Sequence, residues 1–195
     1  MSASNSSIRA RNRQRRNQLT HLEQSAHAIG LANQVCRSRP FLNSRRIACY
    51  LANDGEIDPA YIIHTAWKCR KQVYLPVLSP FQHKLYFAPY TRGMDMHINR
   101  FNIPEPARSP AGWLNAWQLD LMLLPLVAFD DNGNRMGMGG GFYDRSLAYR
   151  QSRTHSLKPR LIGLAHELQR EQQLATNRWD IPLDMIATEK RVITI

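Results

Sequence analysis

Hydrophobic residues recur along the chain either at helical spacing or in short continuous runs, and helical spacing dominates the first part of the chain. Beyond the basic stretch 8–16, the residues from Thr20 to about Ser38 follow helical spacing, and Thr20 forms a capping-box signature with Glu23. Pro40 is predicted to end this region, because proline cannot continue a helix. The pattern predicts two short helices, or one interrupted helix.

Short apolar runs bounded by turn residues predict the strands of a sheet. The run 120–128, DLMLLPLVA, is the most hydrophobic, so we place it at the sheet centre. Helical segments separate the strands: one is opened by Asp58 as N-cap and Pro59 as first residue, and another runs from about Phe142 to Arg150. The predicted strands are 46–51, 72–78, 84–89, 120–128, 160–165 and 190–195.

Strands that alternate with helices predict the α/β class, with a largely parallel central sheet flanked by helices. This sheet would belong to a single domain that spans residues 8–195. The Ser/Asn-rich residues 1–7 are predicted to be a disordered N-terminus. Residues 90–118 hold many turn residues, so we predict an irregular crossing there.

Composition narrows the class of protein without choosing its partner. A chain of 195 residues fits one domain, and 43% hydrophobic with 21% charged residues is typical of a globular protein. No apolar run approaches the roughly 18 residues that span a bilayer, and no secretory signal is visible, so we expect a cytoplasmic protein. Cys36, Cys49 and Cys69 form no CxxC pair, which predicts reduced, buried thiols. The net charge of +11 attracts nucleic acid, polyphosphate and polycarboxylate alike.

The strongest chemical signal is the segment Arg135–Asp144, which follows the central run and precedes a helix. Its glycines let backbone N–H groups turn toward one anion, because no Cβ blocks positive φ or close approach. Arg135 and Arg145 would clamp phosphate oxygens, and Asp144 would hold a magnesium ion. The segment therefore predicts a nucleotide-phosphate site in a small enzyme.

This glycine-rich segment matches neither of the two common phosphate motifs. No Gly-Lys-Ser/Thr follows it, as a Walker A motif would require, and Phe142 stands where a dinucleotide fingerprint has its third glycine. The alternative is a flexible turn with only a structural role. The neighbouring central strand, the two arginines and the aspartate favour the phosphate site.

Four weaker candidates each have a structural alternative. The arginines of 8–16 would contact phosphates or RNA, or form a solvated helix face. Glu56 would hydrogen-bond a ligand ring, or only complement a helix dipole. Phe101, before a proline-rich turn, would line a pocket, or lie in a segment that only crosses the surface. Asp180 and Asp184 would each add a metal ligand, or cap turns.

The segments taken together resemble one known family. The stretch 123–145, LLPLVAFDDNGNRMGMGGGFYDR, resembles the signature of the 5-formyltetrahydrofolate cyclo-ligases, also called methenyltetrahydrofolate synthetases. Three other pieces match in order: IRARNRQRRNQLT at 8–20, YLANDGEI at 50–57 and NIPEP at 102–106. The resemblance runs from about residue 8 to residue 194. The glycine signature is highly specific, whereas the other pieces would be weak alone.

The resemblance implies both a fold and a reaction. The fold is a Rossmann-like α/β sheet of the kind shared with ribose-isomerase and CoA-transferase-like proteins. The reaction converts 5-formyltetrahydrofolate and ATP to 5,10-methenyltetrahydrofolate, ADP and phosphate, with Mg²⁺. ATP would phosphorylate the formyl oxygen, and N10 would then attack the activated carbon. The protein would align the formyl oxygen with the γ-phosphate and neutralise charge.

The resemblance also implies roles for particular residues. Catalysis would fall to Arg135, Tyr143 and Arg145, and Mg²⁺ binding to Asp144 and Asp184. The folate would contact Leu51, Glu56 at the pterin ring, Phe101, Met138, Gly139, Gly140, Gly141 and Phe142. The ATP site would comprise Asn5, Arg9, Arg135, Met136, Gly137, Met138, Gly139, Gly140, Gly141, Phe142 and Tyr143.

The chain departs from the family's pattern at two places. Members often carry a lysine four residues before the arginine equivalent to Arg9, and this chain has Asn5 there. Some members have a lysine in the glycine run, or a tyrosine before the equivalent of Tyr143. This chain has Gly140 and Phe142 instead, so its loop offers no lysine contact.

Two other classes of protein stay open at this point. One is a basic RNA-binding α/β protein whose glycine loop is structural, for which binding would fall steeply with salt and no ATP would turn over. The other is a relative of phosphosugar isomerases or CoA-transferases, which rests on fold analogy alone. For the cyclo-ligase we expect a monomer with no specific nucleic-acid partner and no membrane partner. The charge of +11 is compatible with polyglutamylated folates as substrates.

Overall fold

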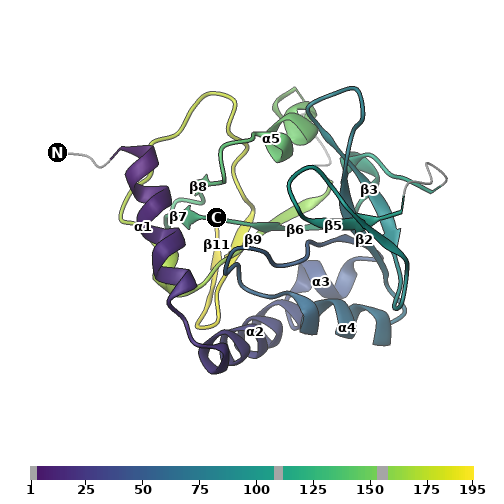
Figure 1. The fold of residues 1–195 in the computed structure, drawn as a ribbon, viewed down its shortest axis with the longest axis horizontal. Helices are drawn as coiled ribbons and strands as arrows, with labels where there is room; N and C mark the ends of the chain where they lie inside the picture. The colour runs from purple at the N-terminus through teal and green to yellow at the C-terminus, as the bar shows by residue number, and fades with distance from the viewer. Residues whose placement is uncertain (1–3, 108–111, 153–157) are drawn as a thin grey trace.

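A seven-stranded sheet runs through the molecule, with helices packed on both of its faces (Figure 1). This computed structural model describes residues 4–107, 112–152 and 158–195. The strands follow one another across the sheet in the order β11-β10-β9-β6-β1-β2-β3. Their bounds are β1 Arg46–Ala48, β2 Gln72–Leu78, β3 Leu85–Tyr90, β6 Leu121–Pro125, β9 Arg160–Leu164, β10 Met185–Ala187 and β11 Val192–Thr194.

The inner strands of the sheet are parallel, and antiparallel β3 and β11 form its two edges. The predicted α/β class with a largely parallel central sheet is therefore confirmed. β6, from the run 120–128, lies at the centre as predicted. Two small antiparallel hairpins stand apart from the sheet. They pair β4 Met96–Ile98 with β5 Pro104–Pro106, and β7 Ala128–Phe129 with β8 Arg135–Met136.

In the described residues, five α-helices surround the sheet. In Figure 1, α2, α3 and α4 lie along one side of the sheet, α5 lies on the other, and α1 stands at one end. The predicted capping box forms at the start of α2: Thr20 Oγ1 accepts from Glu23 N at 3.3 Å, and Glu23 Oε2 accepts from Thr20 N at 2.8 Å. The bounds are α1 Asn5–Asn17, α2 His21–Cys36, α3 Arg39–Asn43, α4 Ala60–Lys68 and α5 Phe142–Leu147.

Alternate side chains of β6 enter two separate cores. Leu121 and Leu123 join the cluster that includes residues of α2 and α4, whereas Met122 and Leu124 join the cluster that includes Leu147 of α5. Successive side chains of a strand point to opposite faces. Because both faces of this strand are covered, the sequence shows a continuous apolar run instead of an alternating one.

The N-terminus is more ordered than the sequence predicts. α1 begins at Asn5, so residues 5–7 are helical, whereas the prediction placed 1–7 in a disordered segment. The reason is a local cap, since Ser4 Oγ accepts a hydrogen bond from Ser7 N at 3.3 Å. Residues 1–3 lie outside the described residues.

Other boundaries differ from prediction because of turn chemistry. Pro40 lies in the first turn of α3, where its missing N–H costs nothing, so it helps to start a helix there. The predicted helix from Phe142 to Arg150 divides into α5 and a 3₁₀ helix, Ala148–Gln151. Strand 46–51 is shorter than predicted and ends at Ala48. β10 was not predicted, because its three residues are too short to show a pattern.

The three cysteines are free thiols. The prediction that they are buried is correct for Cys49, but Cys36 is half-buried and Cys69 is exposed. In the part of the chain that the structure describes, no helix is long and apolar enough to cross a membrane.

Candidate functional site

Two loops meet where the chain changes direction across the sheet. After β1 the chain crosses through α4 to β2, and after β6 it crosses through α5 to β9 on the other side of the sheet. Ligands of open parallel sheets bind beyond the carboxyl ends of the strands at such a switch point. The turn with Glu56 follows β1, and the segment Arg135–Asp144 follows β6. The topology therefore brings two predicted site segments to one edge of the sheet.

Glu56 is the group that couples these two loops. Burial raises the pKa of Glu56 to about 7, and the charge of Arg16 opposes that rise. Burial also raises the pKa of Tyr143, and the charge of Glu56 adds to the rise while Arg135 opposes it. The pKa of the buried Tyr50 is raised by burial first and by Glu56 second. A carboxyl group, two phenols and a guanidinium therefore act on one another within one small region.

The glycine loop has the backbone that its sequence predicts. Gly139 has φ +102° and Gly141 has φ +63°, values that are costly for any residue with a side chain. Among the described residues, a Cβ built on Gly137 would meet nothing within 4 Å, and one on Gly139 would meet only Arg9 Cζ, at 4.0 Å. The loop thus borders open space with a guanidinium beside it, which suits an anion.

α1 connects both loops of the site. Arg9 Nε donates to Gly137 O at 2.9 Å, which places this guanidinium against the glycine loop. Later on the same helix, the buried Arg16 pairs with Asp54 at 2.9 Å and donates to Leu126 O at 3.2 Å. Asp54 belongs to the turn after β1, and Leu126 follows β6. The helix is therefore fixed to the carboxyl ends of the two central strands.

Much of the basic stretch 8–16 is neutralised within the protein. Arg11 pairs with Glu171 at 2.7 Å, and Arg13 pairs with Asp54 at 2.7 Å. Because of these pairs the stretch is not a freely solvated face, although Arg11 and Arg13 stay exposed.

The two arginines that were predicted to clamp phosphate are anchored by protein acceptors. Arg135 pairs with Asp144 and also donates to Ile181 O. Arg145 donates to His83 O at 2.6 Å and to Gly140 O. Each guanidinium borders the glycine loop and also fixes its shape.

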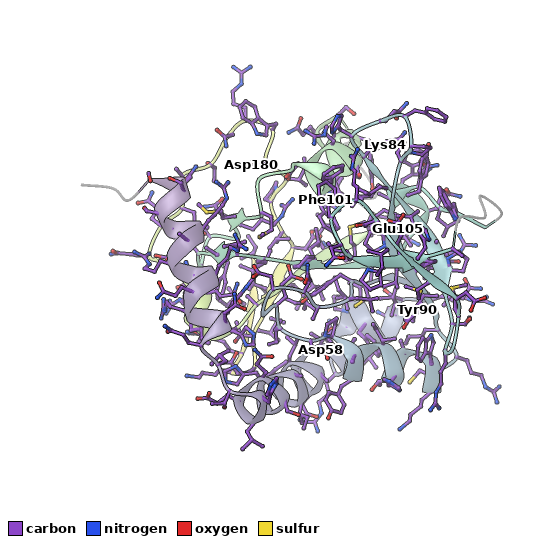
Figure 2. All side chains as sticks on the ribbon, viewed as in Figure 1. Asp58, Lys84, Tyr90, Phe101, Glu105 and Asp180 are labelled. Atoms are coloured by element: carbon purple, nitrogen blue, oxygen red, sulfur yellow. The ribbon has the colours of Figure 1, made fainter. Side chains whose placement is uncertain are left out.

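Aromatic side chains line the other side of the glycine loop. The rings of Phe101 and Phe142 meet edge to face with their centroids 5.6 Å apart, and Phe101 is 49% exposed. Phe101 is held in place by Asn99, whose Oδ1 accepts from Phe101 N at 2.9 Å and whose Nδ2 donates to the buried Glu105 at 3.1 Å. In Figure 2, Phe101 lies on the α5 side of the sheet, and Asp58 lies on the opposite side.

The two predicted magnesium carboxylates have different partners in the protein. Asp144 lies in the first turn of α5 and pairs with Arg135. It also accepts from Ile181 N at 3.3 Å. Asp184 pairs with Arg160 at 3.0 Å and with Arg150 at 3.3 Å. Their shared role at a magnesium ion stays a prediction.

Asp180, the other candidate ligand, caps a turn. Its Oδ2 accepts from Asn177 N at 2.7 Å, which is the structural alternative that the sequence left open.

Four further predicted site residues differ in their exposure. Met138 is 53% exposed in the glycine loop, and Asn5 is exposed at the first position of α1. Leu51 is half-buried beyond β1. Met136 is buried in a small cluster with Ile8, so its side chain packs beneath the loop.

The sequence reasoning missed Tyr50 and the buried role of Arg16. A signal for Arg16 was present, because Ile8, Asn12 and Arg16 recur at four-residue spacing and are the buried residues of α1. Tyr50 carried no such signal, since the strand pattern of 46–51 does not say which side chain approaches Glu56.

Comparison with known proteins assigns the chain to a family. The profile of the 5-formyltetrahydrofolate cyclo-ligase family matches residues 1–189. The chain belongs to this family. The resemblance that the glycine signature predicted is therefore confirmed.

Several cyclo-ligases are similar to this chain along most of its length. Proteins named 5-formyltetrahydrofolate cyclo-ligase from Escherichia coli K12 and Haemophilus influenzae are 39% and 41% identical to it. The first alignment covers 92% of this chain and 97% of the relative, and the second covers 90% and 92%. A mouse cyclo-ligase is 27% identical over 93% of this chain and 92% of its own.

Solved structures share the cyclo-ligase fold. The NMR structure of an Aquifex aeolicus 5,10-methenyltetrahydrofolate synthetase matches with a TM-score of 0.80 at 26% identity, covering 97% of this chain and 92% of that one. A Mycoplasma pneumoniae protein matches with a TM-score of 0.72 at 21% identity, covering 96% of this chain and 99% of that one, and supports the fold alone. The predicted roles of individual residues stay predictions.

Proposed function

We propose that this chain converts 5-formyltetrahydrofolate to 5,10-methenyltetrahydrofolate in a reaction that consumes ATP and releases ADP and phosphate. The observation that carries the proposal is that α1 joins the turn after β1 to the glycine loop, because Arg13 pairs with Asp54 at 2.7 Å and Arg9 Nε donates to Gly137 O at 2.9 Å. A phosphoryl group can pass between two ligands only if their sites adjoin. Membership of the cyclo-ligase family and the names of the curated relatives support the same reaction.

The glycine loop is the proposed site of the ATP phosphates. Open space beside Gly137 and Gly139 leaves their backbone free for close approach by phosphate. Arg9 supplies a positive charge at this loop, and Arg135 supplies a second beside Tyr143. These two charges would neutralise the phosphates without changing the positions of the strands.

The folate would lie between the turn after β1 and the aromatic wall. The carboxyl group of Glu56 suits the N–H donors of a pterin ring, which would form two parallel hydrogen bonds with it. Phe101 and Phe142 offer apolar faces on the opposite side, and Leu51 lies five residues before Glu56 in the chain. In this arrangement Tyr143 stands between the two ligands.

The proposed chemistry has two steps. The formyl oxygen attacks the γ-phosphorus and ADP leaves, which gives an imidate-like phosphate. N10 then attacks the activated carbon and loses its proton, the ring closes, and the C–O bond breaks to release phosphate. The residues of this chain act by holding the formyl oxygen in line with the phosphate and by stabilising charge, with Arg135 nearest and Arg145 assisting.

Magnesium fits one of the two predicted carboxylates better than the other. Mg²⁺ in nucleotide sites takes one or two carboxylates together with phosphate oxygens and water. Asp144 suits this role, since it follows the glycine loop and its contacts with described residues fall on Oδ1 alone. Asp184 accepts hydrogen bonds from Leu161 N at 2.7 Å and from two arginines. It would therefore bind a shared ion only after these hydrogen bonds break. When bound, the ion would neutralise charge on the phosphates.

An absorbance assay tests this proposal. Purified protein given 5-formyltetrahydrofolate and Mg-ATP should form the absorbing methenyl product, and it should form none without ATP. Arg9→Ala should raise the KM for ATP several-fold and leave the KM for folate unchanged. Arg15→Ala, at an exposed position of the same helix, is the matched control. A protein that binds ATP normally and forms no product would contradict the assigned reaction.

A further inference from the structure

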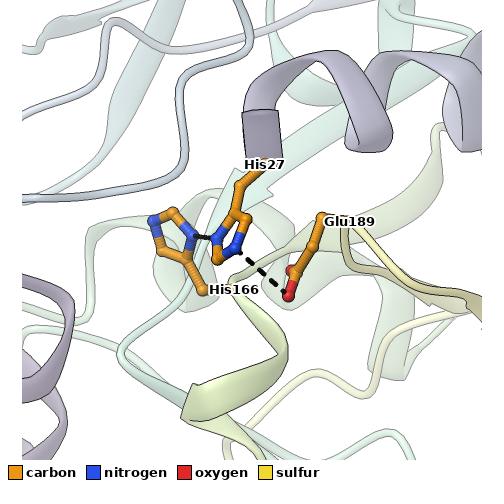
Figure 3. A group of neighbouring side chains, drawn as sticks. All are labelled: His27, His166 and Glu189. Atoms are coloured by element: carbon orange, nitrogen blue, oxygen red, sulfur yellow. Dashed lines mark hydrogen bonds and ion pairs between the residues drawn. The ribbon is translucent and has the colours of Figure 1, made fainter. Parts of the chain in front are cut away.

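A cluster of two histidines and a glutamate lies outside the two loops described above (Figure 3). His27 comes from α2, His166 follows β9, and Glu189 follows β10. One potential ligand atom from each of the three lies within 4.8 Å of the other two. Three elements that are distant in sequence therefore present metal-ligating groups to one point.

The contacts within the cluster are close and partly shielded from solvent. His27 Nδ1 lies 2.8 Å from His166 Nδ1, and His27 Nε2 lies 3.8 Å from Glu189 Oε1. The His166 residue is fully buried, while the side chains of His27 and Glu189 are 23% and 9% exposed. An ion would reach the cluster from the side of His27.

The hydrogen bonds determine which nitrogens carry protons. His166 Nε2 lies 3.3 Å from Gly55 O, and because a carbonyl only accepts, Nε2 is the donor. Neutral His166 therefore has a bare Nδ1, which accepts from His27 Nδ1–H. Neutral His27 then has a bare Nε2, and this lone pair faces the carboxylate of Glu189. Two acceptors that face one another require a proton or a cation between them.

Packing and second contacts hold the three groups in place. A Cβ on Gly30 would lie 2.8 Å from Glu189 O, so α2 approaches the chain after β10 closely, one helical turn beyond His27. Glu189 Oε2 accepts from Glu167 N at 2.9 Å, which orients the carboxylate. A backbone carbonyl on the far nitrogen of His166 is the usual partner of a metal-bound histidine.

We propose that His27, His166 and Glu189 form a site for a divalent transition-metal ion, with Zn²⁺ as the best match. Two imidazoles, one carboxylate and a water are a common zinc ligand set, with bonds of about 2.0–2.2 Å. Two such bonds can bridge the 3.8 Å between His27 Nε2 and Glu189 Oε1. On binding, the His27 ring turns, and its hydrogen bond to His166 is replaced by coordination of His27 Nε2 and His166 Nδ1. No proton is lost, because both of these nitrogens are bare.

A metal at this site would join α2 to the chain after β9 and β10. Through the contact of His166 with Gly55 O it would also support the turn that carries Glu56. The ion would thus be distinct from the magnesium proposed at the phosphates, which takes oxygen ligands.

Zinc titration of the full-length protein tests the proposal. The protein is first stripped with a chelator and then titrated with Zn²⁺ against a chromophoric competitor, with excess Mg²⁺ present and without ATP or folate. We expect one zinc per chain, and a higher melting temperature when zinc is bound. His27→Gln and Glu189→Gln should each weaken zinc binding at least tenfold, and Gln at 189 keeps an oxygen that can accept from Glu167 N. His64→Gln, which changes an exposed histidine of α4, should bind zinc as the unchanged protein does.

Cobalt gives a second readout that does not depend on affinity. Co²⁺ in a site with two histidines and one carboxylate should show visible d–d bands in the unchanged protein and lose them in His27→Gln. The far-UV circular dichroism of each variant establishes that it is folded. The proposal would be overturned by absence of zinc binding at micromolar concentrations. It would also be overturned by equal binding in both cluster variants, which would assign the ion to the exposed Cys69 or to other histidines.

Discussion

Individual ionisable residues connect the two parts of the candidate site, which are the turn after β1 and the glycine loop. Burial raises the pKa of Glu56 to about 7, far above the ordinary value of 4.5, so its charge is easily changed by a ligand. Asp54, only two residues earlier, has a pKa lowered to about 2, chiefly by the hydrogen bond from Arg13. Two carboxyl groups of one turn thus differ in their charge because one is buried and the other is paired with arginine.

Glu56 should make folate binding depend on pH. N–H donors of the pterin favour the ionised carboxylate, so binding should remove the proton that Glu56 carries below its pKa. The affinity for 5-formyltetrahydrofolate should fall up to about tenfold per pH unit below about pH 7. Calorimetry without ATP, in buffers of different ionisation enthalpy, should detect proton release. Glu56→Gln should bind weakly at every pH, and an affinity that stays constant between about pH 6 and pH 8 in the unchanged protein would argue against this role.

Asp144 and Asp184 should respond differently to neutralisation. Asp144→Asn should raise the magnesium concentration needed for half-maximal activity by roughly tenfold, because one ion ligand weakens. Asp184→Asn should mainly lower stability, by about 1–3 kcal/mol, because Arg150 and Arg160 lose their shared carboxylate. Magnesium titrations of activity, with thermal denaturation alongside, separate the two effects. An equal shift of the magnesium response in both variants would show that both carboxylates hold the ion.

Among the elements, the glycine loop is the one whose conformation was most predictable. The glycine content of the loop predicted positive φ, and two of its glycines have it. What the local sequence could not predict is how the loop is held in place. Arg135 joins it to Ile181, and Arg145 joins it to His83, across separations of 46 and 62 residues. Such contacts depend on the sheet and cannot be inferred from spacing.

Two glycines of this loop form a matched pair for substitution. Gly139→Ala should destabilise the ligand-free protein by about 1–2 kcal/mol, because φ of +102° is unfavourable once a Cβ is present. Gly137→Ala should leave stability unchanged, or raise it by up to about 1 kcal/mol, since no positive φ is found there and a Cβ would meet nothing within 4 Å among the described residues. Urea denaturation without ligands measures both, and equal destabilisation would mean that φ does not control the loop.

At the scale of the whole molecule, the main structural feature is the attachment of α1 to the sheet. Arg16 is fully buried and donates to groups that follow β1 and β6. The pairs of Asp54 stabilise the fold above its ordinary pKa of 3.8, and this stability is lost as the pH falls toward the folded value of about 2. The N-terminal helix is thereby part of the domain, and it carries Arg9 to the glycine loop.

Replacing the buried arginine should detach this helix. Arg16→Met keeps much of the apolar stem but removes donors to Asp54 and Leu126 O, so we expect a loss of about 2–4 kcal/mol. Arg15→Met changes the exposed neighbour and should alter stability by less than about 0.5 kcal/mol. Chemical denaturation compares the two variants. A loss of similar size in both would assign the effect to helix charge instead of the buried contacts.

The sequence by itself determined the α/β class, the central place of the run 120–128, the positive φ values of the glycine loop and the family. The periodicity of apolar residues predicts the class and the central strand, the conformational freedom of glycine predicts the loop, and a specific signature identifies the family. All three properties depend only on residues that are neighbours in the sequence. The tertiary structure decided which side chains are brought together: Arg16 with Asp54, and His27 with His166 and Glu189, while the charge of Glu56 acts on Tyr143. It also paired Asp184 with Arg150 and Arg160, and Asp144 with Arg135. The physical reason is that pKa shifts, buried ion pairs and metal clusters depend on distances across the sheet, and those distances exist only once the strands have paired.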